Sequence, residues 1–190
     1  MAWASLAGDQ KKAKKEGRVI VFVDESAFYM TPTVAKSWSP VRRTPVLAGP
    51  VRRDHLSVIG GLTLEGRLYM HVHQSSIGAL QAVQFVRHLL MHIPARILLL
   101  WDRARIHGGA DLDEFCRLDT IGRLTIEHFP PYAPEVDPQE YVWRELKHVY
   151  LRNLTSHSLD ELWEYLDAAT KRLRARVGLL KNLSRHAGLV

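Results

Sequence analysis

Residues 19–26 read Val-Ile-Val-Phe-Val-Asp-Glu-Ser, an apolar run that is closed by a carboxylate at Asp24. A second apolar run, Ile97–Trp101, is followed directly by Asp102. Continuous apolar runs of this length are typical of parallel strands that are buried on both faces. An ionised carboxylate at the end of such a strand is costly unless it is paired or binds a metal. The two runs therefore predict a cation site at one edge of a sheet.

A third carboxylate, Glu140, lies on a predicted helix that follows a proline-rich loop. Asp137 offers an N-cap and Pro138 suits the first helical position, so the helix should run to about Leu151. The same residues also fit a capping box, in which Glu140 merely returns to the N-cap amide. Other acidic residues are available as third ligands, namely Glu135, Asp137 and Glu145.

The remaining patterns predict an α/β fold. Two strands, His55–Leu64 and Arg67–His73, are separated by the two-residue turn Glu65-Gly66 and should form an antiparallel hairpin. Further elements are expected at 78–92 (helix), 96–101 (strand), 111–118 (helix), 124–129 (strand) and 159–176 (helix). This order predicts a mixed five-stranded sheet with helices on both faces. Asp24 and Asp102 would then lie near each other at the ends of adjacent parallel strands.

Composition limits the class of protein. The chain has 190 residues, 46% of them hydrophobic, which suits one well-buried domain. The formal net charge of +6 favours a polyanionic partner such as nucleic acid. Cys116 is the only cysteine, which argues against an intrachain disulfide or a thiolate zinc cluster and fits a reducing cytosol. No apolar stretch approaches a membrane span, so we expect a cytoplasmic protein without a membrane partner.

Three segments together resemble the DDE transposases of the mariner-like bacterial insertion sequences: VIVFVDES (19–26), ILLLWDRARIH (97–107) and HFPPYAPEVDPQEYVWRELK (128–147). The third is the most specific, because a Pro-Pro-Tyr-x-Pro-x-x-Asn-Pro-x-Glu pattern before a Trp-bearing helix is distinctive of that group. Asp137 stands where that group usually has Asn. The resemblance extends from Lys12 to Leu166. It implies a ribonuclease H-like catalytic domain whose catalytic triad is Asp24, Asp102 and Glu140.

The resemblance also implies a chemistry and partners. The triad would hold two Mg²⁺ ions, for which Mn²⁺ may substitute, with Asp24 bridging both ions. The expected reactions are strand cleavage at the ends of an insertion element and strand transfer into a TA-containing DNA target, by a homodimer on the DNA. Further phosphate or DNA contacts are expected from His107, Arg42, Arg43 and Arg103, the last of which stands where Asn is common.

For domain organisation, we expect a basic linker helix over 1–17, the catalytic domain over 18–176 and a C-terminal tail over 177–190. A helix-turn-helix part that recognises the element ends is expected to be encoded upstream. The protein is expected to act at the nucleoid of a bacterial cell. Two alternatives are a ribonuclease H-like nuclease without strand transfer and a non-catalytic, DNA-binding transposase remnant.

Several other residues are assigned structural roles. Strand alternation sends Glu25 to the face opposite Asp24, so Glu25 is left out of the metal set. Trp143 and Trp163 are expected in the core. His71 and His73 share one strand face, but two histidines without a third partner do not predict a zinc site.

Overall fold

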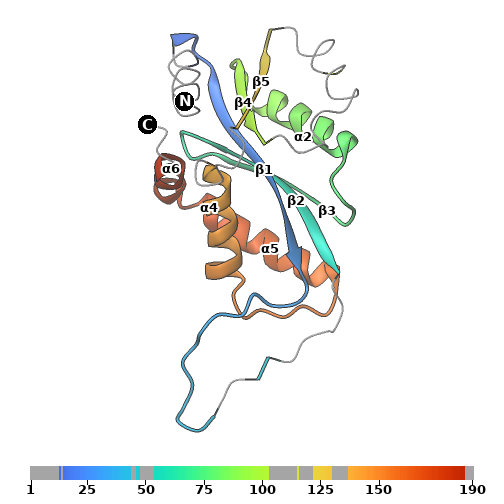
Figure 1. The fold of residues 1–190 in the computed structure, drawn as a ribbon, viewed down its shortest axis with the longest axis vertical. Helices are drawn as coiled ribbons and strands as arrows, with labels where there is room; N and C mark the ends of the chain where they lie inside the picture. The colour runs from blue at the N-terminus through green and yellow to red at the C-terminus, as the bar shows by residue number, and fades with distance from the viewer. Residues whose placement is uncertain are drawn as a thin grey trace.

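The computed structural model describes residues 13, 15–43, 46–47, 54–102, 115, 122–129 and 137–186. Within these residues, one mixed sheet has the strand order β3-β2-β1-β4-β5 (Figure 1). Central β1 pairs with β2 in antiparallel fashion and with β4 in parallel fashion, and β4 pairs in parallel with β5. The strands are β1 (Val19–Tyr29), β2 (His55–Thr63), β3 (Leu68–His73), β4 (Ile97–Trp101) and β5 (Leu124–His128). The predicted five-stranded mixed sheet is confirmed.

The register of β1 and β4 brings the first two carboxylates to the same level of the sheet. Val23 is paired with Trp101, so Asp24 and Asp102 are the next residues along two adjacent parallel strands. β4 ends at this point, whereas β1 continues to Tyr29 because β2 keeps pairing with it. β1 is therefore longer than the predicted strand that ended at Asp24.

The hairpin between β2 and β3 is antiparallel as predicted, but its turn is not the expected two-residue turn. The N–H of Thr63 donates to the carbonyl of Arg67 at 3.0 Å, and the N–H of Gly66 donates to the carbonyl of Thr63 at 3.0 Å. The loop thus contains three residues, 64–66. Gly66 has φ +77°, the left-handed conformation that closes three-residue hairpin loops and that glycine adopts at little cost.

Helices cover both faces of the sheet, as predicted (Figure 1). On one face, α2 (Ala79–His92) buries Phe85, Val86 and Leu89 against the strands. The other face is covered by α4 (Pro138–Glu145), the π-helical segment η3 (Leu146–Tyr150), α5 (Leu159–Arg174) and α6 (Val177–His186). The apolar stripe predicted for α5 is buried: Leu162, Leu166, Ala169 and Leu173.

The C-terminal segment differs from the predicted tail. α5 ends at Arg174 and residues 177–186 form α6, because Leu180 and Leu183 are buried in the same core as Leu173. At the other end of the chain, the predicted linker helix is described only at Ala13 and Lys15, which are both helical.

Two further findings concern helices. The helix predicted over 111–118 lies outside the described residues, except for Phe115, which is helical and buried. No helix among the described residues is long and apolar enough to cross a bilayer.

One glycine of β2 controls how closely α4 approaches the sheet. Gly60 is paired with Asp24 across the β1–β2 ladder and lies beneath α4. A Cβ at this position would come within 2.6 Å of Cη2 of Trp143 and would also overlap the side chain of Gln139. Real Cβ atoms do not approach so closely, so α4 can occupy its place only because residue 60 has no side chain.

We therefore expect Gly60→Ala to lower the melting temperature, because the added methyl group pushes Trp143 out of its packed position. Overpacking of this kind costs about 1–3 kcal/mol, and each kcal/mol corresponds to roughly 2–4 °C for a chain of this size. Thermal unfolding followed by circular dichroism measures the shift. Gly178→Ala is the matched control, since a Cβ there meets nothing within 4 Å and lies in α6. A Gly60→Ala protein as stable as the control would contradict this account.

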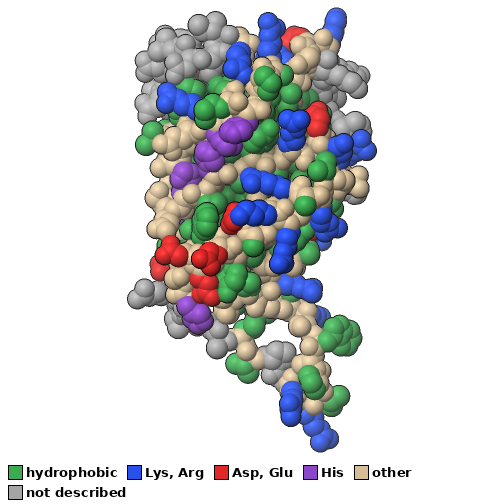
Figure 2. All heavy atoms as spheres, turned by 180° about the vertical axis from the view of Figure 1, so that it is seen from behind, with side chains coloured by type: hydrophobic (Ala, Val, Ile, Leu, Met, Phe, Trp, Pro, Cys, Tyr) green, Lys and Arg blue, Asp and Glu red, His purple; other side chains and the backbone are tan. Residues whose placement is uncertain are grey.

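A row of histidines, here called the histidine seam, lies between β3 and α2 and consists of His71, His73, His88 and His92. The ring centroids of His71 and His88 are 4.6 Å apart, and those of His88 and His92 are 4.1 Å apart. Histidine side chains form such a row on the face seen in Figure 2. Burial, reinforced by His71, His92 and Arg174, lowers the pKa of His88 to about 4. Burial also lowers the pKa values of His71 and His73.

The seam should make the domain sensitive to acid. Because these pKa values lie below the ordinary value of 6.5, the unfolded chain binds more protons than the folded chain once the pH falls below about 6.5. The contribution of the seam to stability should then be constant above that pH and decline toward pH 4, whereas Asp24, whose pKa is raised to about 7, contributes in the opposite sense. His88→Gln should flatten this decline between pH 6.5 and 4. An unchanged pH dependence in that variant would show that the carboxylates, not the seam, control acid stability.

Candidate active site

The carboxylate of Asp24 is half-buried in the middle of the sheet and is bonded to the helix layer. The indole Nε1–H of Trp143, on α4, donates to Oδ2 of Asp24 at 2.8 Å. Burial raises the pKa of Asp24 to about 7, the Trp143 hydrogen bond opposes that rise, and the charges of Glu25 and Glu140 add to it. The surroundings of Asp24 therefore disfavour the ionised form of its carboxyl group.

Glu140 is carried by the first turn of α4. The helix begins as predicted, with Asp137 as N-cap and Pro138 at the first position. The Asp137 carboxylate accepts the backbone N–H of Gln139 at 2.9 Å. Trp143 follows Glu140 by three residues, and residues at this spacing share one helix face. Glu140 thus lies one turn from the residue that contacts Asp24, in agreement with the effect of its charge on Asp24.

Asp137 brings a further carboxylate into this region. It is 7% exposed, and burial raises its pKa well above the ordinary value. The charges of Asp24, Glu140 and Asp102 also contribute to that rise. All three residues of the predicted triad therefore lie close enough to Asp137 to act on its charge. The structure concentrates negative charge where β1, the end of β4 and the start of α4 meet.

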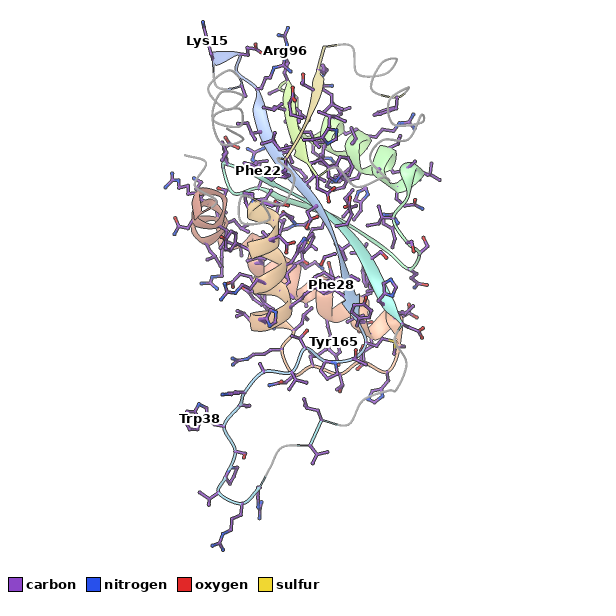
Figure 3. The ribbon with its side chains drawn as sticks, in the orientation of Figure 1. Lys15, Phe22, Phe28, Trp38, Arg96 and Tyr165 are labelled. Atoms are coloured by element: carbon purple, nitrogen blue, oxygen red, sulfur yellow. The ribbon has the colours of Figure 1, made fainter. Side chains whose placement is uncertain are left out.

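Lys147 supplies positive charge to the same region. Its Nζ donates to Oγ of Ser26 at 2.7 Å and lies 5.2 Å from the ring centroid of Phe28. Desolvation lowers the pKa of Lys147, while the charges of Glu140 and Asp24 oppose this lowering. Ser26 and Phe28 share one face of β1 with Asp24, and Phe28 is labelled in Figure 3.

Glu25 is turned to the other face of the sheet, as predicted from strand alternation. The indole Nε1–H of Trp101 donates to Oε1 of Glu25 at 3.1 Å. Trp101 belongs to the core beneath α2. Two neighbouring carboxylates of β1 are thus held by two tryptophans on opposite faces of the sheet.

The other predicted site residues are placed as follows. Asp102 is half-buried directly after β4. Arg42 and Arg43 are exposed in the segment that follows β1 and extends from the body of the domain, the segment that contains the labelled Trp38 in Figure 3. The structure therefore does not bring these two arginines to the carboxylates. Arg103, His107 and Glu135 lie outside the described residues.

The donor set fits a hard divalent cation. Mg²⁺ and Mn²⁺ prefer carboxylate oxygens, and a cation would stabilise the ionised forms that burial and, to a lesser extent, repulsion disfavour at Asp24 and Asp137. Gln139, next to Glu140, buries a side-chain amide whose oxygen and nitrogen have no hydrogen-bond partner among the described residues. As the described side chains stand, no three Asp, Glu, His or Cys residues among them are arranged to hold an ion.

The sequence analysis did not identify the contacts of Trp143 and Lys147 in this region. It also misplaced Trp163, which lies on α5. Trp143 was expected only in the core; it is 2% exposed, but it also binds Asp24. Lys147 was not singled out, although its spacing of seven residues from Glu140 indicates a shared helix face. Trp163 was expected in the core and is 48% exposed, so that prediction was wrong.

Comparison with solved structures identifies the fold. The chain is similar to the Mos1 transposase in a paired-end complex with the left transposon end (TM-score 0.63, 18% identity, 96% of this chain and 60% of that chain). It is similar to the Mos1 mariner paired-end complex with Mn (TM-score 0.66, 17% identity, 98% and 60%). It is also similar to the catalytic domain of the Mos1 mariner transposase (TM-score 0.60, 16% identity, 98% and 90%). The predicted ribonuclease H-like fold is thereby confirmed.

The chain spans 60% of the length of the transposase chains in those two paired-end complexes and 90% of the isolated catalytic domain. A comparison with curated protein sequences gives no match. The family described as DDE superfamily endonuclease matches residues 19–170, which contain Asp24, Asp102 and Glu140. Because this match covers most of the sequence, the chain belongs to the DDE superfamily endonuclease family.

Proposed function

We propose that this chain is the catalytic domain of a DNA transposase, which cleaves DNA strands at element ends and transfers them to a target. The observation that carries the proposal is that the charges of Asp24, Asp102 and Glu140, from three separate elements, all act on the buried Asp137. Membership of the DDE endonuclease family and the fold of a transposase catalytic domain support it. The resemblance favours a TA-containing target, a homodimer on the DNA, a helix-turn-helix part for end recognition and action in the bacterial cytoplasm.

Asp24, Asp102 and Glu140 would hold two Mg²⁺ ions, or Mn²⁺ in their place. The ions would supply an activated water or hydroxyl and charge stabilisation for the leaving oxygen of the phosphodiester. The residues of this chain then have distinct roles. The three carboxylates would hold the cations, and the packing of α4 against β1 partly shields Asp24 from water.

Lys147 is proposed to contact a DNA phosphate beside the reacting one. Its ammonium group lies on the same face of β1 as Asp24 and contacts the neutral groups of Ser26 and Phe28. Moving from the hydroxyl of Ser26 to a phosphate oxygen would give Lys147 a charge-assisted hydrogen bond, which is stronger than a neutral one.

The first test of the proposed function replaces the carboxylates. Asp24→Asn, Asp102→Asn and Glu140→Gln should each reduce Mg²⁺-dependent nicking of plasmid DNA to background, and the double variants should lose no more than the single ones. Glu25→Gln is the matched control and should nick normally, because Glu25 faces the other side of the sheet. Near-normal nicking by Glu140→Gln would transfer its role to Asp137 or Glu135.

The products of the same assay separate the candidate activities. Covalent joining of the cut ends to a second plasmid is expected for a transposase. Nicking without joining would identify a ribonuclease H-like nuclease. DNA binding without any nicking in Mg²⁺ or Mn²⁺ would identify a non-catalytic remnant.

The second test concerns DNA affinity, measured with chelator present so that cleavage plays no part. Binding to duplexes should be largely independent of sequence and fall steeply with salt, because phosphate neutralisation dominates. Lys147→Met should reduce the slope of log affinity against log salt by about one, the loss of one phosphate contact. Lys171→Met is the control, because Lys171 is paired with Asp167 at 2.6 Å. Equal slopes for the Lys147→Met and wild-type proteins would refute the contact.

A further inference from the structure

We propose that Trp143 is a positioning residue for the metal-binding carboxylates. Its indole N–H fixes the rotation of the Asp24 carboxylate and ties β1 to α4, and so it sets the separation between Asp24 and Glu140. This inference rests on the proposed function, because it assigns to Trp143 a role in the ion site of that function.

The first support is that the indole itself is immobilised. Trp143 is 2% exposed, and its ring meets the ring of Phe28 edge to face, with centroids 5.9 Å apart and planes at 75°. A tryptophan held in this way presents a single N–H donor in one fixed direction. That donor is 2.8 Å from Oδ2 of Asp24.

The second support is the chemistry of the aspartate. The terminal torsion of an aspartate side chain has a broad energy profile, so the side chain does not choose the orientation of its two oxygens by itself. To hold cations, the carboxylate of Asp24 would have to present its oxygens in a defined orientation. The Trp143 N–H uses one acceptor site of Oδ2, which leaves the other site of Oδ2 and all of Oδ1 for cations. The hydrogen bond therefore orients the carboxylate without occupying it.

The third support is the space that the sheet provides for the indole. Gly60 is the cross-strand partner of Asp24, and a Cβ on Gly60 would lie 2.6 Å from Cη2 of Trp143. The absence of a side chain opposite Asp24 is what allows the ring to reach the strand. Glu140 precedes Trp143 by one helical turn, so the depth to which the indole penetrates also fixes how near Glu140 comes to Asp24.

A purely structural explanation would make Trp143 one more packed aromatic residue. The chain contains an internal comparison for this alternative. Trp101 is also buried, and its indole N–H also donates to a carboxylate of β1, that of Glu25, at 3.1 Å. Trp101→Phe and Trp143→Phe thus make the same chemical change in two buried indoles, but the N–H of Trp143 donates to a proposed metal ligand and that of Trp101 donates to Glu25.

The deciding experiment measures Mn²⁺ binding by electron paramagnetic resonance on the full chain. Trp143→Phe should weaken Mn²⁺ binding about 10- to 100-fold, the range found when a partner that orients a metal ligand is removed. Trp101→Phe should bind Mn²⁺ as the wild type does, even if its melting temperature falls as far. Equal Mn²⁺ affinity in the Trp143→Phe and wild-type proteins, or equal losses in both variants, would overturn the positioning role.

Two further measurements keep the inference testable. If Trp143→Phe does not fold, replacement of Trp143 by benzothienylalanine retains the ring shape and puts sulfur in place of the N–H, and the same loss of Mn²⁺ affinity is expected.

In nuclear magnetic resonance spectra, Asp24→Asn should shift the indole N–H signal of Trp143, and Glu25→Gln should shift that of Trp101 instead. A wild-type protein that binds no Mn²⁺ would refute the proposed ion site, and the positioning role with it; Mn²⁺ binding that survives in Trp143→Phe would refute the positioning role alone.

Discussion

The desolvation of neighbouring carboxyl groups, and the repulsion among them where β4 ends beside β1, is the constraint on which the rest of the site depends. Burial raises the pKa values of Asp24 and Asp137; the charge of Glu140 adds to this effect at both groups, and the charge of Asp102 adds to it at Asp137. Such a cluster opposes folding, since an ionised group leaves water only at a cost. Burial of apolar side chains on both sides of the sheet offsets that cost. Functional sites often concentrate charged groups even though this lowers the stability of the fold.

The arrangement of the strands explains why the charges meet. β1 and β4 are parallel, and Val23 is paired with Trp101, so Asp24 and Asp102 lie at the same level of the sheet. β1 continues past that level, and the added length carries Ser26 and Phe28, which receive Lys147 from the helix layer. A strand that ended at Asp24 would have no surface on which the second half of the α4–η3 helix could rest.

The two tryptophans divide the acidic pair of β1 between the two faces of the sheet. Trp143 holds Asp24 on the α4 face, and Trp101 holds Glu25 on the α2 face. The division matters because an unrestrained Glu25 next to Asp24 would compete for the same cation. Asp137 adds a buried carboxyl group to the α4 face, and burial together with the neighbouring charges raises its pKa well above the ordinary value. The charges of Glu140 and Asp24 also act on Lys147, on the same face.

Much of this site follows from local pattern in the sequence. The buried strands that lead to Asp24 and Asp102, the orientation of Glu25 and the N-cap at Asp137 were predicted correctly, because each depends only on neighbouring residues. The end of β1 was not, because β1 continues to Tyr29 beside β2. The three-residue hairpin loop and the helix over 177–186 were missed, since both depend on partners distant in the chain. Only the tertiary structure decided that Gly60 lies opposite Asp24 and leaves room for Trp143. It also decided that Trp143 donates a hydrogen bond to Asp24, whereas Trp163 is exposed. The physical reason is that a hydrogen bond across 119 residues depends on how two layers pack, and no local preference encodes that distance.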